Sequence, residues 1–198
     1  AGFLTLNAAT TLATTGAATR LSTALKLTNE ISLEVWLTPN STNLPGLGRI
    51  LTFSDGPAAR NFTLGQNDSS FQFRLRTTPP LDLNAHGKTL TGGNAEAGKL
   101  THLVVTRDTT GRARMYVNGI EVANRMISGN FSSWTDTFQL LLGNEAGGGE
   151  SRAWLGELHL AAIYARALSP NEIKQNFEFP VNANLPPVVS AGANEVVD

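Results

Sequence analysis

Arginine, asparagine and glutamine side chains recur at positions of this chain where ordinary turns do not require them. The planar guanidinium of arginine binds carboxylates and sulfates through paired hydrogen bonds and stacks on flat rings. Arg74 and Arg76 lie two residues apart in a strand-like run, so they project from the same face. If that face meets a ligand, the pattern predicts an acidic or sulfated sugar. The full candidate set, with one loop tryptophan, is Arg60, Asn61, Gln66, Arg74, Arg76, Trp134, Asn144, Glu145 and Arg152.

A second interpretation of the arginines is structural. Partly buried arginine usually has a carboxylate partner, and the chain offers Asp55, Glu145, Glu150 and Glu157 for that purpose. Ion pairs of this kind would lock loops and leave no donor for a ligand. Both interpretations stay open at the level of sequence, and ion pairing is the commoner use of such residues.

The three tryptophans have different sequence surroundings. Trp134 lies in a polar segment between Phe131 and Asp136, so it is the better candidate to stack on a sugar from a loop. Trp154 is expected to pack in the core. Trp36 falls on the polar side of its strand and either faces a ligand or plugs an edge of the fold.

Catalytic chemistry has little support in the sequence. His86, His102 and His159 stand in no nucleophile-elbow context, and only two tyrosines are present to serve as a base. For each histidine a surface or strand-edge role is the simpler interpretation. The chain is therefore expected not to be an enzyme.

Composition narrows the function classes. The chain has 198 residues, 16% of them charged, and a formal net charge of −1, which argues against a nucleic-acid partner bound through bulk electrostatics. It has no cysteine, so disulfides, zinc–thiolate sites and thiol nucleophiles are excluded. No apolar run approaches the roughly 18 residues of a membrane span. This turn-rich, polar composition is typical of a secreted or cell-surface β protein.

Short strands separated by turns dominate the predicted elements. Residues 31–37 and 70–77 alternate apolar and polar side chains, as strands with one buried face do. Residues 49–53 and 61–66 are two further strands. Asn118-Gly119 suits a type I′ hairpin turn, and Ser169-Pro170-Asn171-Glu172 predicts a capped helix of about two turns ending at Phe177.

The second half of the chain resembles a known family. Trp154-Leu155-Gly156, a strand to Tyr164, and Arg166-Ala167-Leu168-Ser169 before a helix follow three strands around the Asn-Gly hairpin. Together with the strand at residues 32–40, this order resembles the laminin-G-like (pentraxin-like) branch of the concanavalin A-like lectin and glucanase superfamily, over about residues 3–179. The resemblance implies an all-β, two-sheet antiparallel jelly-roll sandwich with one short C-terminal helix.

The family's chemistry is only partly represented. Its glucanases carry carboxylates that flank the glycosidic bond from one strand, whereas Glu34 and Glu157 here have no carboxylate partner at plus two or plus five. Many relatives bind calcium, but the positions that align with their Asp-Glu pair are His159 and Leu160. Asp55 is the remaining metal candidate, and Asp-Gly is also an ordinary turn. No other cofactor is expected.

Two segments divide the chain. Residues 1–179 form the predicted laminin-G-like domain, and residues 180–198 are a Pro-rich linker leading into the first residues of a module similar to polycystic-kidney-disease-type or other immunoglobulin-like domains. We expect covalently linked neighbouring domains and a monomer.

Three hypotheses follow. The first is a non-catalytic carbohydrate-binding module of a secreted, multidomain bacterial protein, which would hold a polysaccharide and insert into no membrane. The second is a structural or adhesive spacer, or a protein-interaction domain, of a cell-surface protein. The third is a hydrolase of unfamiliar mechanism.

Overall fold

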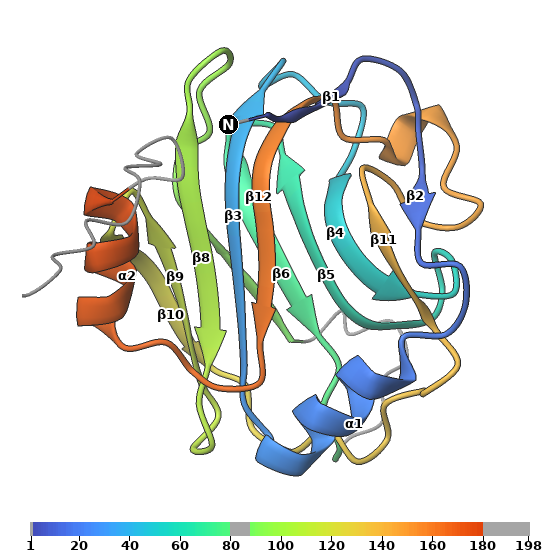
Figure 1. The fold of residues 1–198 in the computed structure, drawn as a ribbon, viewed down its shortest axis with the longest axis vertical. Helices are drawn as coiled ribbons and strands as arrows, with labels where there is room; N and C mark the ends of the chain where they lie inside the picture. Colours follow the sequence, from blue (N-terminus) through green and yellow to red (C-terminus); the bar gives the residue numbers. More distant parts are fainter. Residues whose placement is uncertain (1, 80–87, 180–198) are drawn as a thin grey trace, which may run out of the picture.

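The computed structural model describes residues 2–79 and 88–179, which form two six-stranded antiparallel sheets packed face to face (Figure 1). Sheet A contains, in spatial order, β1 (Leu4–Leu6), β12 (Gly156–Tyr164), β3 (Ile31–Pro39), β8 (Thr101–Arg107), β9 (Arg112–Val117) and β10 (Ile120–Met126). Sheet B contains β2 (Leu12–Ala13), β11 (Gln139–Leu142), β4 (Gly48–Ser54), β5 (Arg60–Asn67), β6 (Ser70–Leu75) and β7 (Thr89–Gly92). The sandwich predicted from the sequence is confirmed.

The core lies between the sheets. Alternation directs Leu33 and Val35 of β3 and Phe71 and Phe73 of β6 into it, and all four side chains are fully buried. The faces predicted for residues 31–37 and 70–75 are therefore correct. Asn118 and Gly119, which join β9 to β10, have φ angles of 52° and 79°, as the predicted hairpin turn requires.

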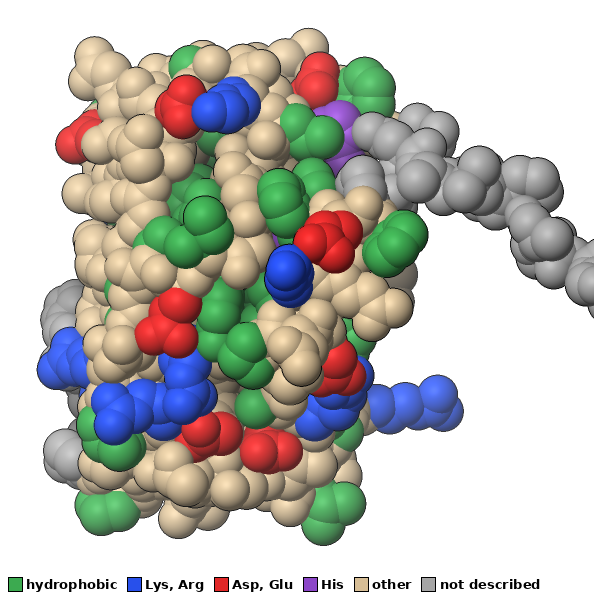
Figure 2. All heavy atoms as spheres, turned by 90° about the vertical axis from the view of Figure 1, so that its left-hand side faces the viewer, with side chains coloured by type: hydrophobic (Ala, Val, Ile, Leu, Met, Phe, Trp, Pro, Cys, Tyr) green, Lys and Arg blue, Asp and Glu red, His purple; other side chains and the backbone are tan. Residues whose placement is uncertain are grey.

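Helix α2 (Pro170–Glu178) covers the outer face of sheet A (Figure 1). Its N-terminus has the predicted capping box between Ser169 and Glu172. Ile173 of this helix packs against Val104 and Tyr116 on the strands beneath. Acidic, basic and apolar side chains are interspersed around the helix on this side of the molecule (Figure 2).

The carboxylate of Glu34 links α2 to sheet A through hydrogen bonds. Glu34 of β3 accepts hydrogen bonds from His102 Nε2 at 2.8 Å, from Tyr164 Oη at 2.7 Å and from Asn176 Nδ2 of α2 at 3.0 and 3.1 Å. Trp36 lies beside this cluster. Its ring centroid is 4.6 Å from that of His102 and 6.0 Å from that of Phe177. Trp36 thus helps to anchor the helix, and its ring also lines a small hollow of about 230 Å³ beside Glu34 and Tyr164.

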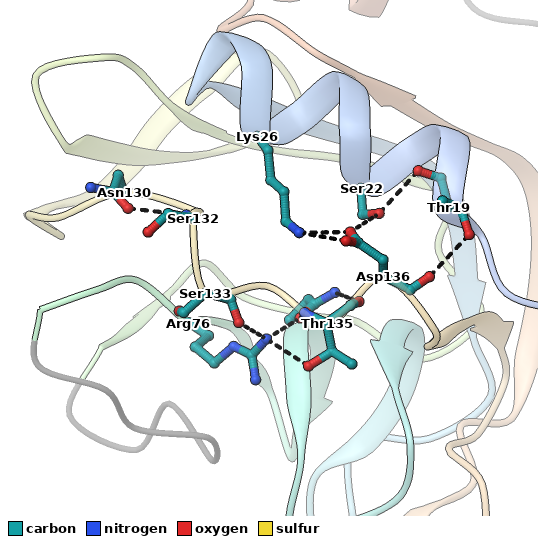
Figure 3. Close-up of polar contacts among 10 residues, drawn as sticks. Thr19, Ser22, Lys26, Arg76, Asn130, Ser132, Ser133, Thr135 and Asp136 are labelled. Carbon is teal, nitrogen blue, oxygen red and sulfur yellow. Dashed lines mark hydrogen bonds and ion pairs between the residues drawn. The ribbon is translucent and has the colours of Figure 1, made fainter.

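Helix α1 (Thr19–Thr28), at one end of the sandwich, is absent from the sequence prediction (Figure 1). Its N-terminal residue Ala18 supplies no side-chain cap, and its threonines are poor helix formers. Tertiary contacts hold it instead. Lys26 binds both carboxylate oxygens of Asp136 at 2.7 and 2.8 Å, and Ser22 donates to the same carboxylate at 2.6 Å (Figure 3).

Some sequence predictions lie outside the described residues, namely those on His86 and on residues 180–198. The division of the chain at residue 179 therefore stays a prediction. Among the described residues, no helix has the length and apolar character that would allow it to cross a membrane.

We expect Glu34 to make folding acid-sensitive. Burial raises the pKa of Glu34, but the hydrogen bonds from His102 and Tyr164 outweigh it and leave the pKa below its ordinary value of 4.5. A carboxyl whose pKa is lower in the folded than in the unfolded chain stabilises the fold fully above its ordinary pKa, and this stabilisation is lost as the pH falls through the folded-state pKa. Glu34→Gln should therefore be less stable than the unmodified protein near neutral pH and lose less stability on acidification.

Urea unfolding at a series of pH values between about 3 and 7 measures both effects. Glu178→Gln, which alters an exposed carboxylate on α2 paired with Lys174 at 3.7 Å, is the matched control and should keep the original pH dependence. An acid profile of Glu34→Gln identical to that of the unmodified protein would contradict the prediction.

Candidate functional site

Four arginines surround a cavity of about 420 Å³ beside sheet B. Arg49 comes from β4, Arg60 from β5, Arg74 from β6, and Arg152 from the single-turn helix η1 (Glu150–Arg152). We call this cavity, with its four guanidinium groups, the arginine pocket. Pro45 and Ser151 contribute to its rim.

Two β-bulges bring arginines from β4 and β5 to the pocket. Arg49 and Arg60 each stand two residues before a core residue, Leu51 and Phe62, so simple alternation would direct them into the core. The register of β4 against β5 shifts between Arg49 and Leu51, and again between Phe53 and Ser54. Each shift turns an arginine to the outer face, which Arg74 already shares because it lies between core-facing Phe73 and Leu75.

One buried carboxylate faces this cluster. Glu145, with no solvent exposure, contacts Nε of Arg49 through Oε2 at 3.1 Å, and its Oε1 accepts from Nη2 of Arg49 at 3.1 Å and from Nη1 of Arg152 at 2.9 Å. Nη1 of Arg49 donates to the carbonyl of Leu47 at 2.5 Å. Arg49 and Arg152 are therefore held by the protein itself, and for Arg152 this is an ion pair of the kind that the second interpretation of the sequence offered.

Arg60 and Arg74 keep unused donors. Nη2 of Arg60 donates to the carbonyl of Pro57, but its Nε and Nη1 are buried and have no partner in the described parts of the chain. Arg74 has only a long bond of 3.4 Å from Nη2 to Gln72, and its buried Nε has none. A buried N–H group without an acceptor is unfavourable. These two guanidinium groups are thus poised for an acceptor that enters the pocket.

The charge of the pocket also favours an anion. Burial lowers the pKa of Arg60 to about 10, Glu145 opposes this shift, and repulsion from Arg49, Arg74 and Arg152 adds to it. The pKa of Arg74 is lowered by burial and by repulsion from Arg49. Because one carboxylate cannot neutralise four cations, a bound anion would relieve this repulsion. Among the described residues, no carboxylate, histidine or tyrosine lines the cavity to act as an acid, base or nucleophile.

Arg76 and Asn61 do not reach the arginine pocket. Arg76 is fully buried, and its Nη2 donates to Asn61 Oδ1 at 2.7 Å, to the carbonyl of Ser133 at 2.7 Å and to Thr135 Oγ1 at 3.1 Å (Figure 3). Asn61 Nδ2 donates to the carbonyl of Thr135 at 2.9 Å. The prediction that Arg74 and Arg76 bind one ligand together is wrong, since β6 ends at Leu75 and the chain turns Arg76 towards the loop at residues 133–135.

Gln66 and Trp134 are structural as well, which corrects their prediction as ligand-binding residues. Gln66 is buried, donates to the carbonyls of Ser41 and Asp68, and accepts from Trp154 Nε1 at 2.8 Å. Trp134 is 3% exposed, stacks on Phe131 at 4.4 Å and donates from Nε1 to the carbonyl of Arg76 at 2.7 Å. A buried indole offers no face to a sugar. Trp154 packs in the core, as predicted.

The loop at residues 144–152 shapes one wall of the pocket. Asn144 is buried, and its Nδ2 donates to the carbonyl of Gly149 at 3.0 Å while its Oδ1 accepts from the amide of Glu145. It therefore positions Glu145 and is not a ligand-binding residue. Arg49, which belongs to the pocket, is missing from the sequence prediction. Gly48 before it is the only signal, because a glycine inside a strand often marks a bulge.

Asp55 is the residue predicted to bind calcium. Asp55 is exposed in a turn, where its amide donates to the carbonyl of Ala59 at 3.0 Å. Within residues 2–79 and 88–179, no group of three or more His, Cys, Asp or Glu side chains is arranged to hold a metal. The calcium role of Asp55 stays a prediction.

Comparisons with known proteins agree with the architecture. A family model described as the concanavalin A-like lectin/glucanases superfamily matches residues 12–174. A search of curated proteins found no significant match. The CBM40 domain of the Ruminococcus gnavus IT-sialidase, solved bound to α2,3-sialyllactose, aligns with a TM-score of 0.65 at 15% identity over 88% of this chain and 96% of that one.

Two further solved structures share the fold. A SAP-like pentraxin from Limulus polyphemus aligns with a TM-score of 0.58 at 18% identity, covering 76% of this chain and 70% of its own. A Trypanosoma rangeli sialidase aligns with a TM-score of 0.54 at 19% identity over 76% of this chain but only 23% of that chain. At these sequence identities the structural similarity establishes the sandwich fold only. It does not assign the ligands of those proteins to this chain.

Glu145 should be indispensable to the folded pocket. Removing its charge by Glu145→Gln leaves buried cations without a counter-charge, which we expect to cost about 3–5 kcal/mol in free energy of unfolding, measured by urea denaturation. Glu96→Gln, in an exposed pair with Lys99 at 3.0 Å, is the control and should change little.

A double-mutant cycle separates the pair from its surroundings. Combining Glu145→Gln with Arg49→Met removes both buried partners and should recover part of the lost stability. Strictly additive losses in the double variant would show that Glu145 and Arg49 do not act as a pair.

Proposed function

This chain belongs to the concanavalin A-like lectin/glucanases superfamily, and we propose that it is a non-catalytic domain that binds an acidic or sulfated glycan in the arginine pocket. The observation that carries the proposal is a pair of arginines beside the cavity, the buried Arg60 and the half-buried Arg74, which have buried N–H donors without partners. A carboxylate or sulfate ester accepts two such bonds at once.

The size and surroundings of the pocket support a sugar rather than a small ion. A cavity of about 420 Å³ has room for a whole sugar ring, and such volumes are usual for small-molecule sites. Its rim, with Pro45, Pro57 and Leu47, offers apolar surface to the ring carbons. One structural relative, the CBM40 domain, was solved with an acidic oligosaccharide bound, which supports this ligand class for the fold.

The lining of the pocket supports binding without catalysis. Glycoside hydrolysis requires two carboxyl groups across the glycosidic bond. The carboxylate near the pocket, Glu145, is already hydrogen-bonded to Arg49 and Arg152. We further propose that the domain acts as a secreted or cell-surface monomer within a longer, multidomain bacterial protein. Its modest net charge and polar, cysteine-free composition are compatible with that setting.

The spacer hypothesis retains one supporting observation. Glu145 ties together β4 and the η1 turn, as a loop-locking ion pair would. This accounts for Arg49 and Arg152 but leaves the unused donors of Arg60 and Arg74 without a purpose. Glycan binding would give the donors of Arg60 and Arg74 an acceptor.

Arg74→Ala should weaken glycan binding about ten- to hundredfold, because it removes a charge-assisted hydrogen-bond donor from a half-buried site. Arg74→Lys should recover only part of the affinity, since lysine keeps the charge but not the planar pair of donors. Titration calorimetry would use α2,3-sialyllactose, a uronic-acid oligosaccharide, a sulfated oligosaccharide and an uncharged one.

Arg20→Ala is the matched control, because Arg20 is an exposed arginine on α1 and its loss changes the net charge equally. It should bind like the unmodified protein. Absence of binding to every acidic oligosaccharide, or equal losses in the Arg20 and Arg74 variants, would refute the proposal.

A further inference from the structure

A second hollow of about 410 Å³ lies beside the arginine pocket. Its walls are mainly apolar, with Leu44, Pro45, Ala153 and Leu155 among them, and two alanines near the N-terminus, Ala8 and Ala9, complete one side. We call it the Leu44 pocket. The backbone amide of Leu44 donates to Asp68 Oδ1 at 3.1 Å, which holds this wall in place.

The two pockets share a boundary. Pro45 lines both. Two chain segments cross there, with Arg49 and Ala153 paired as an isolated bridge. Ser151 and Arg152 face the arginine pocket, whereas Ala153 faces the Leu44 pocket. A ligand lying across Pro45 therefore contacts both cavities, and this continuity ties the second hollow to the proposed glycan site.

The chemistry of the Leu44 pocket is opposite to that of its neighbour. Among the described residues, no arginine or lysine lines it, and Glu150 supplies its one charged group, a carboxylate. This carboxylate would repel a second anionic group. The amides of Asn40 and Asn43, both exposed residues, supply donors and acceptors beside the apolar walls.

No aromatic side chain among the described residues lines the cavity, so a flat stacking contact with a sugar ring is not available. At about 410 Å³ the hollow has room for a substituent and part of the sugar that carries it, and a neutral substituent with one methyl and one amide matches its apolar walls and asparagine amides. The methyl group would contact Leu44 and Leu155, and the amide would exchange hydrogen bonds with an asparagine. An acetamido substituent has this composition.

We propose that the Leu44 pocket binds the acetamido group of an N-acetylated sugar whose anionic group occupies the arginine pocket. This inference rests on the proposed glycan-binding function and narrows its ligand to acidic glycans that carry an N-acetyl group close to the charge. The two groups can belong to one sugar or to neighbouring sugars of a chain.

Matched ligands test the acetamido group directly. α2,3-Sialyllactose and its KDN analogue differ only in acetamido against hydroxyl on the acidic sugar. Hyaluronan and polygalacturonate oligosaccharides differ in whether an N-acetylated sugar adjoins each uronic acid. The N-acetylated member of one pair should bind about tenfold more tightly, as burial of a methyl group with one amide hydrogen bond implies. The pair that shows the difference identifies whether the group lies on the same or on the neighbouring sugar.

Protein variants assign the effect to the pocket. Leu44→Ala and Asn43→Ala should each abolish most of the preference, because they weaken the N-acetylated ligand much more than the ligand without the acetamido group. Leu27→Ala, at an 86% exposed leucine on α1, is the control and should keep the preference. Near-UV circular dichroism and urea unfolding would verify that each variant is folded.

The outcomes separate this inference from the function on which it rests. Equal affinity within both ligand pairs, or a preference untouched by the Leu44 and Asn43 variants, overturns the acetamido site while acidic glycans still bind and Arg74→Ala still weakens them. Failure of every acidic glycan to bind refutes the proposed function and this inference together.

Discussion

Buried guanidinium groups must find hydrogen-bond acceptors, and much of this fold depends on how they do so. Arg107, on β8 of sheet A, donates from Nε to the carbonyl of Ile127 at 3.2 Å and from its two terminal nitrogens to the carbonyls of Asn29 and Gly129. Arg76, which follows β6 of sheet B, binds the carbonyl of Ser133. One arginine from each sheet thus donates hydrogen bonds to the segment at residues 127–135. Asp136, directly after that segment, anchors α1, so the helix that lacks a capping side chain depends on the same arrangement.

The arginine pocket follows the same rule with a different result. Arg49 and Arg152 share Glu145, so their acceptors are part of the protein. For Arg60 and Arg74 the described chain supplies fewer acceptors than these groups have donors. A ligand in the open cavity would supply acceptors and remove the cost of leaving such groups without partners. Arg76 also has buried donors without a partner, at Nε and Nη1, but it does not line the cavity, so the position beside the opening, and not unused donors alone, distinguishes Arg60 and Arg74.

The sequence was informative where a local rule decides the structure. Alternation placed Phe71 and Phe73 in the core, and the Ser169–Glu172 capping box and the Asn118-Gly119 turn formed as predicted. Prediction failed where tertiary contacts override a local rule. Bulges, which depend on the partner strand, carry Arg49 and Arg60 to the outer face. Trp134 looked loop-borne and exposed, yet stacking on Phe131 and a bond to the Arg76 carbonyl bury it. Spacing identifies an arginine, but only the three-dimensional arrangement shows whether its donors are satisfied.

The two outer faces of the sandwich explain why a ligand would choose sheet B. On sheet A, α2 covers the strands, and Glu34 accepts bonds from three neighbours on both of its oxygens. A carboxylate so engaged has little capacity left for a substrate, and Tyr164, whose pKa is raised to about 12 by burial and by Glu34, keeps its proton at neutral pH. On sheet B no helix of the described residues covers the arginines, and the bulges that would weaken an ordinary sheet instead concentrate positive charge at one opening. The proposed recognition of an anion therefore falls on sheet B, where donors without partners lie beside an open cavity.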